Sequence, residues 1–136
     1  MPTADRVLLD THALLWWKAG AERLSATAAR LIDTASEVLI SPINCWEVAV
    51  LVGKDRVQLD RPVRTWVTDV LASDGVELAP LTASIAVAAA ELSEFHGDPA
   101  DRFLVATATT NRVPLVTKDR LIHAHADSTD GFEVIW

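Results

Sequence analysis

Residues 97–106 read Gly-Asp-Pro-Ala-Asp-Arg-Phe-Leu-Val-Ala, and they join a pair of acids to an almost wholly apolar run. Pro99 suits the first position of a helix, where its missing N–H costs no hydrogen bond. Asp98 is then the N-cap, and Asp101 lies in the first turn. The run that follows is too apolar for a surface helix, so it belongs in the core. The sequence therefore predicts two carboxylates at the mouth of a buried helix.

Short apolar strands alternate with helices along the rest of the chain. Such alternation predicts βαβ units, a parallel sheet and helices on both of its faces. With 136 residues, the chain is long enough for one domain with one core. The expected strands are 6–9, 38–40, 76–78, 113–116 and 132–135, and the expected helices are about 10–19, 26–35, 42–52, 62–72, 83–94 and 99–111, with a helical turn at 121–122.

Composition excludes several classes of protein. The net charge of −7 argues against a protein that coats nucleic acid non-specifically, although it does not exclude a nucleic-acid enzyme. No apolar run reaches the roughly 18 residues of a membrane span, and the N-terminus does not begin as a secretory signal. Cys45 is the single cysteine, so no internal disulfide forms. We expect a cytoplasmic protein without a membrane anchor.

Four acids are expected to meet at one edge of the sheet. In an open parallel sheet the functional crevice lies at the carboxyl ends of the strands. Asp10 follows the first strand, and Asp119 follows the strand predicted at 113–116. Glu47 lies in the second turn of a helix that starts at a strand end, and Asp101 lies in the first turn of its helix. These positions bring Asp10, Glu47, Asp101 and Asp119 to a common place.

Each acid also has a plainer explanation. Asp10 is a good N-cap, Asp119 a good turn residue, and Asp101 complements a helix dipole. Glu47 is harder to explain, because an isolated carboxylate in an apolar helix is rare unless it is paired or liganded. As a cluster, the four need a cation to offset their repulsion. A set of carboxylates suits a hard ion, so we expect Mg²⁺ or Mn²⁺.

Four segments together resemble the PIN domain, and more narrowly the VapC-type ribonuclease toxins of bacterial type II toxin–antitoxin pairs. They read Val-Leu-Leu-Asp-Thr-His at 7–12, Ile-Ser-Pro-Ile-Asn-Cys-Trp-Glu at 40–47, Asp-Pro-Ala-Asp-Arg-Phe-Leu-Val-Ala-Thr-Ala at 98–108 and Leu-Val-Thr-Lys-Asp at 115–119. The resemblance covers essentially the whole chain in the family's order. It implies a single PIN-like nuclease domain over residues 1–136, folded as a three-layer α/β/α sandwich with a mostly parallel sheet.

The resemblance also implies a reaction, a Mg²⁺-dependent endoribonucleolytic cleavage of RNA phosphodiester bonds that leaves 5′-phosphate and 3′-hydroxyl ends. The family's acidic site carries over to the four acids named above. Asp10 and Asp101 are the first choices for metal ligands, Asp119 follows, directly or through water, and Glu47 holds a second metal or orients the water. Asp98 and Thr117 are expected to assist, Asp98 chiefly as the helix cap.

The same resemblance implies partners. RNA is the expected substrate, with Arg102 and Lys118 as phosphate contacts because each adjoins a site acid; ordinary solvated surface is the alternative for both. A cognate antitoxin that blocks the site and a homodimer are expected from the family. His12 and His96 adjoin site acids. Two roles stay open for them, tuning of those acids and contact with RNA.

Other functions fit less well. A phosphatase of the Asp-nucleophile type needs a second Asp two residues after the first, where this chain has His12. A catalytically inactive PIN-like module that acts only through its partner stays open as the alternative function. His123 and His125 are a weak zinc signal and are expected in a solvated loop. The three tryptophans expected in the core are Trp46, Trp66 and Trp136.

Overall fold

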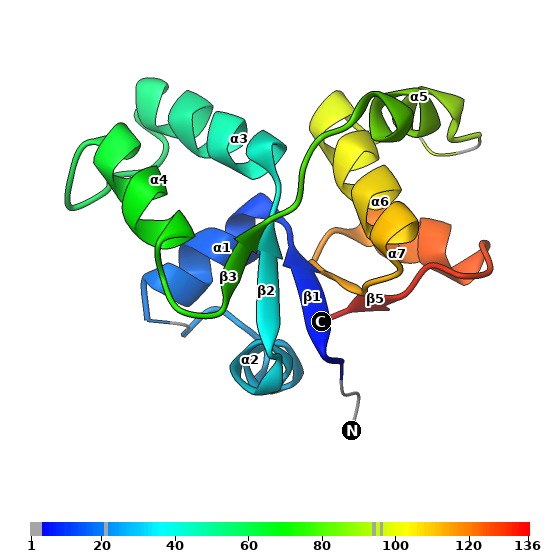
Figure 1. Cartoon of the computed structure of the whole chain (residues 1–136), viewed down its shortest axis with the longest axis horizontal. Helices are drawn as coiled ribbons and strands as arrows, with labels where there is room; N and C mark the ends of the chain where they lie inside the picture. The colour runs from blue at the N-terminus through cyan, green and yellow to red at the C-terminus, as the bar shows by residue number, and fades with distance from the viewer. Residues whose placement is uncertain (1–3, 21, 94, 96) are drawn as a thin grey trace.

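The computed structural model describes residues 4–20, 22–93, 95 and 97–136. Its strands form one sheet in the order β3-β2-β1-β4-β5, and every neighbouring pair is parallel (Figure 1). The first strand along the chain thus lies in the middle of the sheet. The strands are β1 (Arg6–Leu9), β2 (Glu37–Ile40), β3 (Val76–Leu78), β4 (Leu115–Val116) and β5 (Val134–Ile135).

The helices connect these strands, and their ends follow local capping rules. Ser41 accepts a hydrogen bond from the backbone N–H of Ile43 and Asn44 reaches back to the N–H of Ser41, which fixes the start of α3. Arg112, with φ 54°, ends α6 in a left-handed cap. The helices are α1 (Thr11–Lys18), α2 (Ala26–Thr34), α3 (Pro42–Gly53), α4 (Val63–Leu71), α5 (Ala83–Glu91), α6 (Pro99–Asn111) and α7 (Arg120–Asp127).

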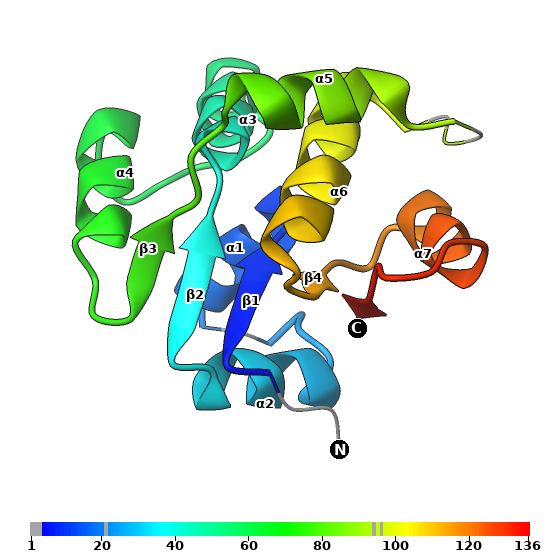
Figure 2. The ribbon, with the colours of Figure 1, turned by 45° about the vertical axis from the view of Figure 1, so that its right-hand side comes forward.

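Alternate residues of the strands bury against different helices, which creates three layers. Val7 and Leu9 pack with side chains of α1, α2 and α4, whereas Leu8 packs with side chains of α6 and α7. In Figure 2, α2 lies at the foot of strands β1 and β2, whereas α6 and α7 lie to the right. The predicted α/β class with a parallel sheet and helices on both faces is therefore confirmed. In the described ranges, no helix is long and apolar enough to cross a membrane.

The places of one tryptophan and of two histidines differ from expectation. Trp66 is buried as predicted, but Trp46 is 58% exposed, because it lies on the face of α3 that turns away from the sheet. The histidines expected in a solvated loop lie in α7, which runs for eight residues. His123 Nε2 lies 2.7 Å from the carbonyl oxygen of Thr117, and the ring of His125 packs against Phe rings. The prediction of loop histidines is wrong because an Asp119 cap starts a full helix there.

The topology sends several helix starts to one edge of the sheet. One residue separates β1 from α1 and β2 from α3, and three residues separate β4 from α7. Since all strands are parallel, these three N-termini lie at the carboxyl edge. Helix N-termini carry unpaired N–H groups and the positive end of the dipole, so that edge accommodates negative charge.

Candidate active site

An open pocket of about 430 Å³ lies at this edge. It collects side chains from segments more than a hundred residues apart in the sequence, and five of the ten described residues that line it are acids. The lining residues are Asp10, Thr11, His12, Trp16, Glu47, Asp98, Asp101, Leu104, Lys118 and Asp119. The four acids that the sequence places together, and Asp98 beside them, thus share one pocket.

Asp10 is the most strongly fixed of these acids. It caps α1, and its Oδ1 accepts a hydrogen bond from the backbone N–H of Ala13 at 2.7 Å. Its Oδ2 accepts a hydrogen bond from the hydroxyl of Thr117, a fully buried residue. Burial is the main reason that the pKa of Asp10 is raised, and the two hydrogen bonds oppose it. Both carboxylate oxygens are therefore held in place.

Glu47 is held in a similar way. Its Oε1 accepts a hydrogen bond from the hydroxyl of Thr11, which is 2% exposed. Burial raises the pKa of Glu47, and the nearby charges of Asp98 and Asp10 raise it further. Glu47 is only partly buried, and its carboxylate lines the pocket. A carboxylate in this apolar helix thus has both a partner and an opening to solvent.

Asp98 and Asp101 have different environments although they are three residues apart. Asp98 is exposed and caps α6, accepting a hydrogen bond from the backbone N–H of Asp101 at 2.9 Å. Asp101 is half-buried, and its pKa is raised to about 7, with burial as the largest cause. The charges of Asp98, Asp119, Glu47 and Asp10 add to that rise, in this order. Asp101 therefore lies where the negative field of the cluster is felt most.

Asp119 and Lys118 complete the pocket. Asp119 caps α7 by accepting from the backbone N–H of Ile122 at 3.0 Å, and its own N–H donates to the Thr117 hydroxyl. Lys118 is exposed and takes part in none of the ion pairs between described residues. Among the described residues that line the pocket, it is the one Lys or Arg. Its charge is thus available to a bound anion.

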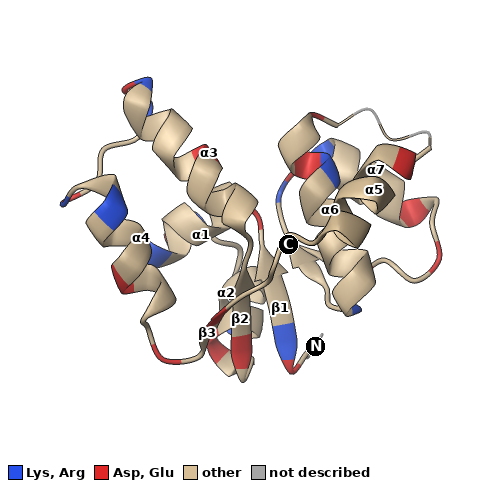
Figure 3. Ribbon diagram, turned by 45° about the horizontal axis from the view of Figure 1, so that its top comes forward, with Lys and Arg blue, Asp and Glu red and all other residues tan. Residues whose placement is uncertain are grey.

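Arg102 does not have the place predicted for it. Its guanidinium donates to four backbone carbonyl oxygens, those of Ala89, Ala90, Leu92 and Phe95, at 2.6–3.2 Å. These carbonyls end α5 and begin the loop that leads to α6. Figure 3 shows that the charged residues of α6 gather at its start and that the rest of the helix is uncharged. Arg102 therefore ties α5 to α6, and it is not among the described residues that line the acidic pocket.

The donor set of the pocket fits a hard divalent cation. Carboxylate and hydroxyl oxygens are the ligands that Mg²⁺ and Mn²⁺ prefer. Within the described part of the chain, no three Asp, Glu, His or Cys side chains are already gathered closely enough to hold one ion together. Asp10 and Glu47 instead direct an oxygen each to a threonine. Mg²⁺ keeps several of its waters, so it suits carboxylates that it reaches partly through water.

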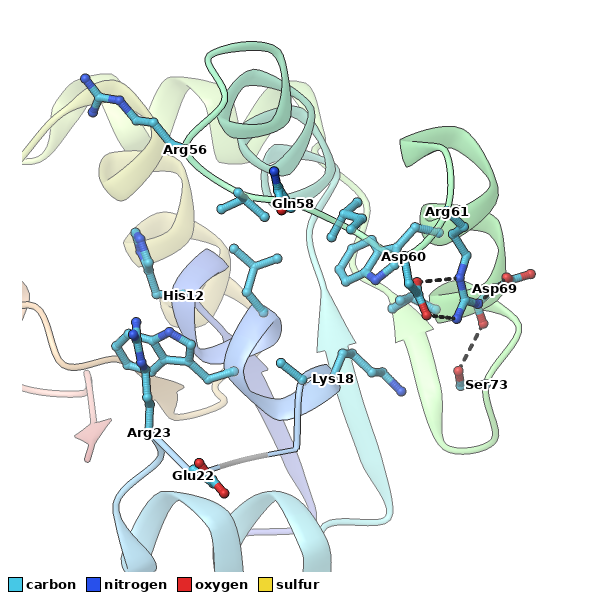
Figure 4. A pocket seen from close by; sticks show the side chains of 17 residues that line it. His12, Lys18, Glu22, Arg23, Arg56, Gln58, Asp60, Arg61, Asp69 and Ser73 are labelled. Carbon is cyan, nitrogen blue, oxygen red and sulfur yellow. Dashed lines mark hydrogen bonds and ion pairs between the residues drawn. The ribbon is translucent and has the colours of Figure 1, made fainter.

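A larger hollow of about 770 Å³ adjoins the acidic pocket and shares His12 and Trp16 with it. In Figure 4, His12, Arg23 and Arg56 lie at one end of this hollow, and Arg61 lies at the other, bound to two carboxylates. The hollow lacks the cluster of acids with raised pKa values. Because such clusters mark sites of chemistry, the smaller pocket is the candidate active site.

Residues 7–127 match the family described as the PIN domain. The chain belongs to the PIN-domain family. It is of the VapC type, since it is 41% identical over 120 residues to Ribonuclease VapC22 of Mycobacterium tuberculosis, a match that covers 88% of this chain and 91% of that protein. The predicted family is thereby confirmed.

Solved structures of PIN-domain proteins share the fold. A toxin–antitoxin complex from Klebsiella pneumoniae has a TM-score of 0.66 at 21% identity and covers 96% of each chain. VapC20 of Mycobacterium tuberculosis, described as a toxin that cleaves the sarcin–ricin loop, also has a TM-score of 0.66, at 18% identity over 88% of this chain and 95% of that one. At such identities the likeness concerns the fold alone.

Two residues of this PIN-domain site could not be assigned a role from the sequence. Thr11 and Asn44 are buried and connected to Glu47 by hydrogen bonds, and the sequence patterns assign no role to either. The pattern Ser-x-x-Asn at 41–44, a capping box at the end of a strand, was the available signal. His12 is exposed and lies against the ring of Trp16, whereas His96 lies outside the described residues.

Proposed function

We propose that this protein is the endoribonuclease toxin of a toxin–antitoxin pair, and that it hydrolyses RNA phosphodiester bonds with Mg²⁺ or Mn²⁺ at the acidic pocket. The observation that carries the proposal is the meeting of Asp10, Glu47, Asp98, Asp101 and Asp119 in one pocket of a VapC-type PIN domain. A cluster of this charge, with Asp101 at a pKa of about 7, calls for a cation at neutral pH.

The charge environment and the hydrogen bonds of each acid indicate its role in metal binding. Asp101 has the most unfavourable charge environment, so it gains most from a cation and is the first ligand. Asp10 offers oxygens that are already oriented, and Asp119 is a third ligand, directly or through water. Glu47 is placed to orient the attacking water or to hold a second ion. When bound, the metal supplies activation of water and stabilisation of charge on phosphate and leaving oxygen.

Substrate binding needs positive charge in an otherwise acidic pocket. Lys118 is the lysine at its rim and has no carboxylate partner among the described residues. We assign it to a phosphate oxygen of the RNA. Phosphate contacts of this kind position the chain of nucleotides without reading the bases.

A cognate antitoxin and a second copy of the toxin are the proposed protein partners. The 770 Å³ hollow beside the pocket offers an antitoxin segment a way to reach the pocket edge. Trp46 and Val87, each 58% exposed, are apolar side chains that a homodimer would cover. We place the pair in the cytoplasm, which agrees with a chain that has one cysteine.

Cleavage by the purified protein tests this function. Asn caps helices as well as Asp does, and Asn still accepts the Ala13 N–H, so Asp10→Asn keeps α1 while removing a ligand charge. We expect the wild type to cleave RNA with Mg²⁺ and not with EDTA, and Asp10→Asn to be inactive but folded. Asp33→Asn, an exposed acid in α2, is the matched control and stays active. Equal cleavage by Asp10→Asn would refute the site, and RNA or antitoxin binding without any cleavage by the wild type would favour an inactive PIN-like module.

A further inference from the structure

Asn44 lies one helical turn before Glu47 on α3, so both side chains face the start of α1. Thr11, the first residue of α1, lies between them. Asn44 is fully buried and Thr11 is 2% exposed, whereas Glu47 reaches the pocket. A buried polar chain of three residues thus runs from the interior to a pocket carboxylate.

The hydrogen bonds among these three side chains all donate in one direction, from Asn44 through Thr11 to Glu47. The backbone N–H of Ser41 donates to Asn44 Oδ1 at 2.8 Å, which leaves Asn44 Nδ2 on the side of Thr11. Nδ2 can only donate, and it donates to Thr11 Oγ1 at 3.1 Å. The hydroxyl of Thr11 has a single proton, and with its oxygen accepting from Asn44 that proton points to Glu47 Oε1. The capping box of α3 therefore orients a hydroxyl two steps away.

We infer that Asn44 is a positioning residue for Glu47, acting through Thr11. With its donor in place, Thr11 offers Glu47 a hydrogen bond at a fixed place and holds one carboxylate oxygen, so that the other faces the pocket. Without the donor, the Thr11 hydroxyl is free to rotate, and Glu47 loses its anchor. This role rests on the proposed function, because it concerns the carboxylate that orients water or a second ion.

A second threonine shows the same arrangement. Thr117 is fully buried, its hydroxyl accepts from the backbone N–H of Asp119 at 3.1 Å and donates to Asp10. Here the donor that directs the hydroxyl is main chain, which substitution does not remove. Only the Glu47 branch depends on a side-chain donor. Asn44 is thus the position at which this kind of control can be tested.

A double-mutant cycle tests whether Asn44 acts through Thr11. The variants are Asn44→Ala, Thr11→Val, which has the shape of threonine without its hydroxyl, and both together. Partners behind a metal site are worth about 10–100-fold in activity or metal affinity. We expect each single variant to lose about ten-fold or more in kcat with little change in KM for RNA. The double variant should lose no more kcat than either single variant. Thr11→Ser, which keeps the hydroxyl, should have most of the wild-type activity.

Other measurements separate positioning from simple structural support and from failure of the proposed function. Crystal structures of wild type and Asn44→Ala should show Glu47 bound to Thr11 in the first and released in the second. Mn²⁺ affinity in the absence of RNA should fall in Asn44→Ala. Wild-type kcat in Asn44→Ala, or losses that multiply in the double variant, would overturn the inference while leaving the nuclease intact. A wild type that cleaves nothing would overturn the nuclease, and the Glu47 conformations would still decide for or against Asn44.

The cap itself needs a control, because Asn44→Ala also removes the acceptor for Ser41. Asn44→Asp keeps that acceptor and removes the donor, so α3 retains its start if the alanine variant does not fold. The added charge is measured by making the same change in the Thr11→Val background, where the relay is already broken. We expect Asn44→Asp to lose kcat in the wild-type background well beyond its loss in Thr11→Val. Equal losses in both backgrounds would contradict the relay.

Discussion

Replacing Asp101 by Asn should stabilise the metal-free protein, although it removes a ligand. Asp101 has a pKa of about 7 in the folded protein against 3.8 for an unperturbed side chain. Between these two values the folded state holds a proton that the unfolded chain has lost. Stability of the metal-free wild type therefore falls as the pH rises from about 4 to 7, and above 7 the full repulsion is present. Asn carries no charge, so this pH dependence disappears with it.

The size of the effect follows from the same pKa. A difference of this size corresponds to about 4 kcal/mol at most. Asp101 is only half-buried, so water and salt screen its charge. The variant also loses an acid from the first turn of α6, worth up to about 1 kcal/mol. We therefore expect a net gain of about 1–2 kcal/mol at pH 8, or roughly 3–8 °C in Tm for a domain of this size.

Thermal melts followed by circular dichroism, in EDTA and at low ionic strength, measure this gain at pH 8 and at pH 4.5. Asp101→Asn should melt above the wild type at pH 8 and close to it at pH 4.5, whereas the control Asp33→Asn should change neither. Added Mg²⁺ should raise the Tm of the wild type more than that of the variant. A variant that is less stable than the wild type at pH 8 in EDTA, or equally shifted at both pH values, would refute the electrostatic account of the pocket.

Three further predictions concern the neighbours of Asp101. Asp98→Ala should lower stability by about 1 kcal/mol through loss of the α6 cap and leave most of the cleavage, as measured by urea unfolding and RNA assay. Arg102→Leu should lower the free energy of unfolding by about 2 kcal/mol or more, because four carbonyls lose their donor. Arg102→Lys should recover only part of this loss, and equal stability of the wild type and both variants would contradict the role of Arg102 in tying α5 to α6. Lys118→Ala should weaken RNA binding and reduce its salt dependence by about one ion without lowering Tm; an unchanged salt slope would remove Lys118 from the interface.

Much of the fold follows from local signals that agree with one another. The Asp-Pro opening of residues 98–99 predicts the start of α6 at Pro99, and the helix ends at Asn111, about where it was expected to end. The strands at the margin were predicted too long, at 113–116 and 132–135, because apolar runs do not tell where sheet pairing stops. Val113 is buried all the same, in the cluster of side chains that contains Leu8 and Leu104.

The division between Asp98 and Asp101 follows the prediction in its local part. An N-cap side chain turns back to its own helix, and Asp98 accepts the N–H of Asp101 as a cap should. What sequence could not supply is the size of the field at Asp101, because that depends on where the carboxylates of three other segments point. The long-range hydrogen bonds of Thr11 and Thr117 could not be predicted either, because they join positions 36 and 107 residues apart in the sequence. Spacing along the chain carries no information about such contacts.

Arg102 shows why adjacency in sequence is a poor guide to a shared site on a helix. Successive helical residues point about 100° apart, so Asp101 facing the pocket sends Arg102 elsewhere. That other direction leads to the end of α5, where the last carbonyls lack helical partners and attract a cation. There the guanidinium of Arg102 donates hydrogen bonds to four carbonyl oxygens in fixed positions. Lys118 precedes α7 in the loop after β4, and both it and Asp119 line the pocket.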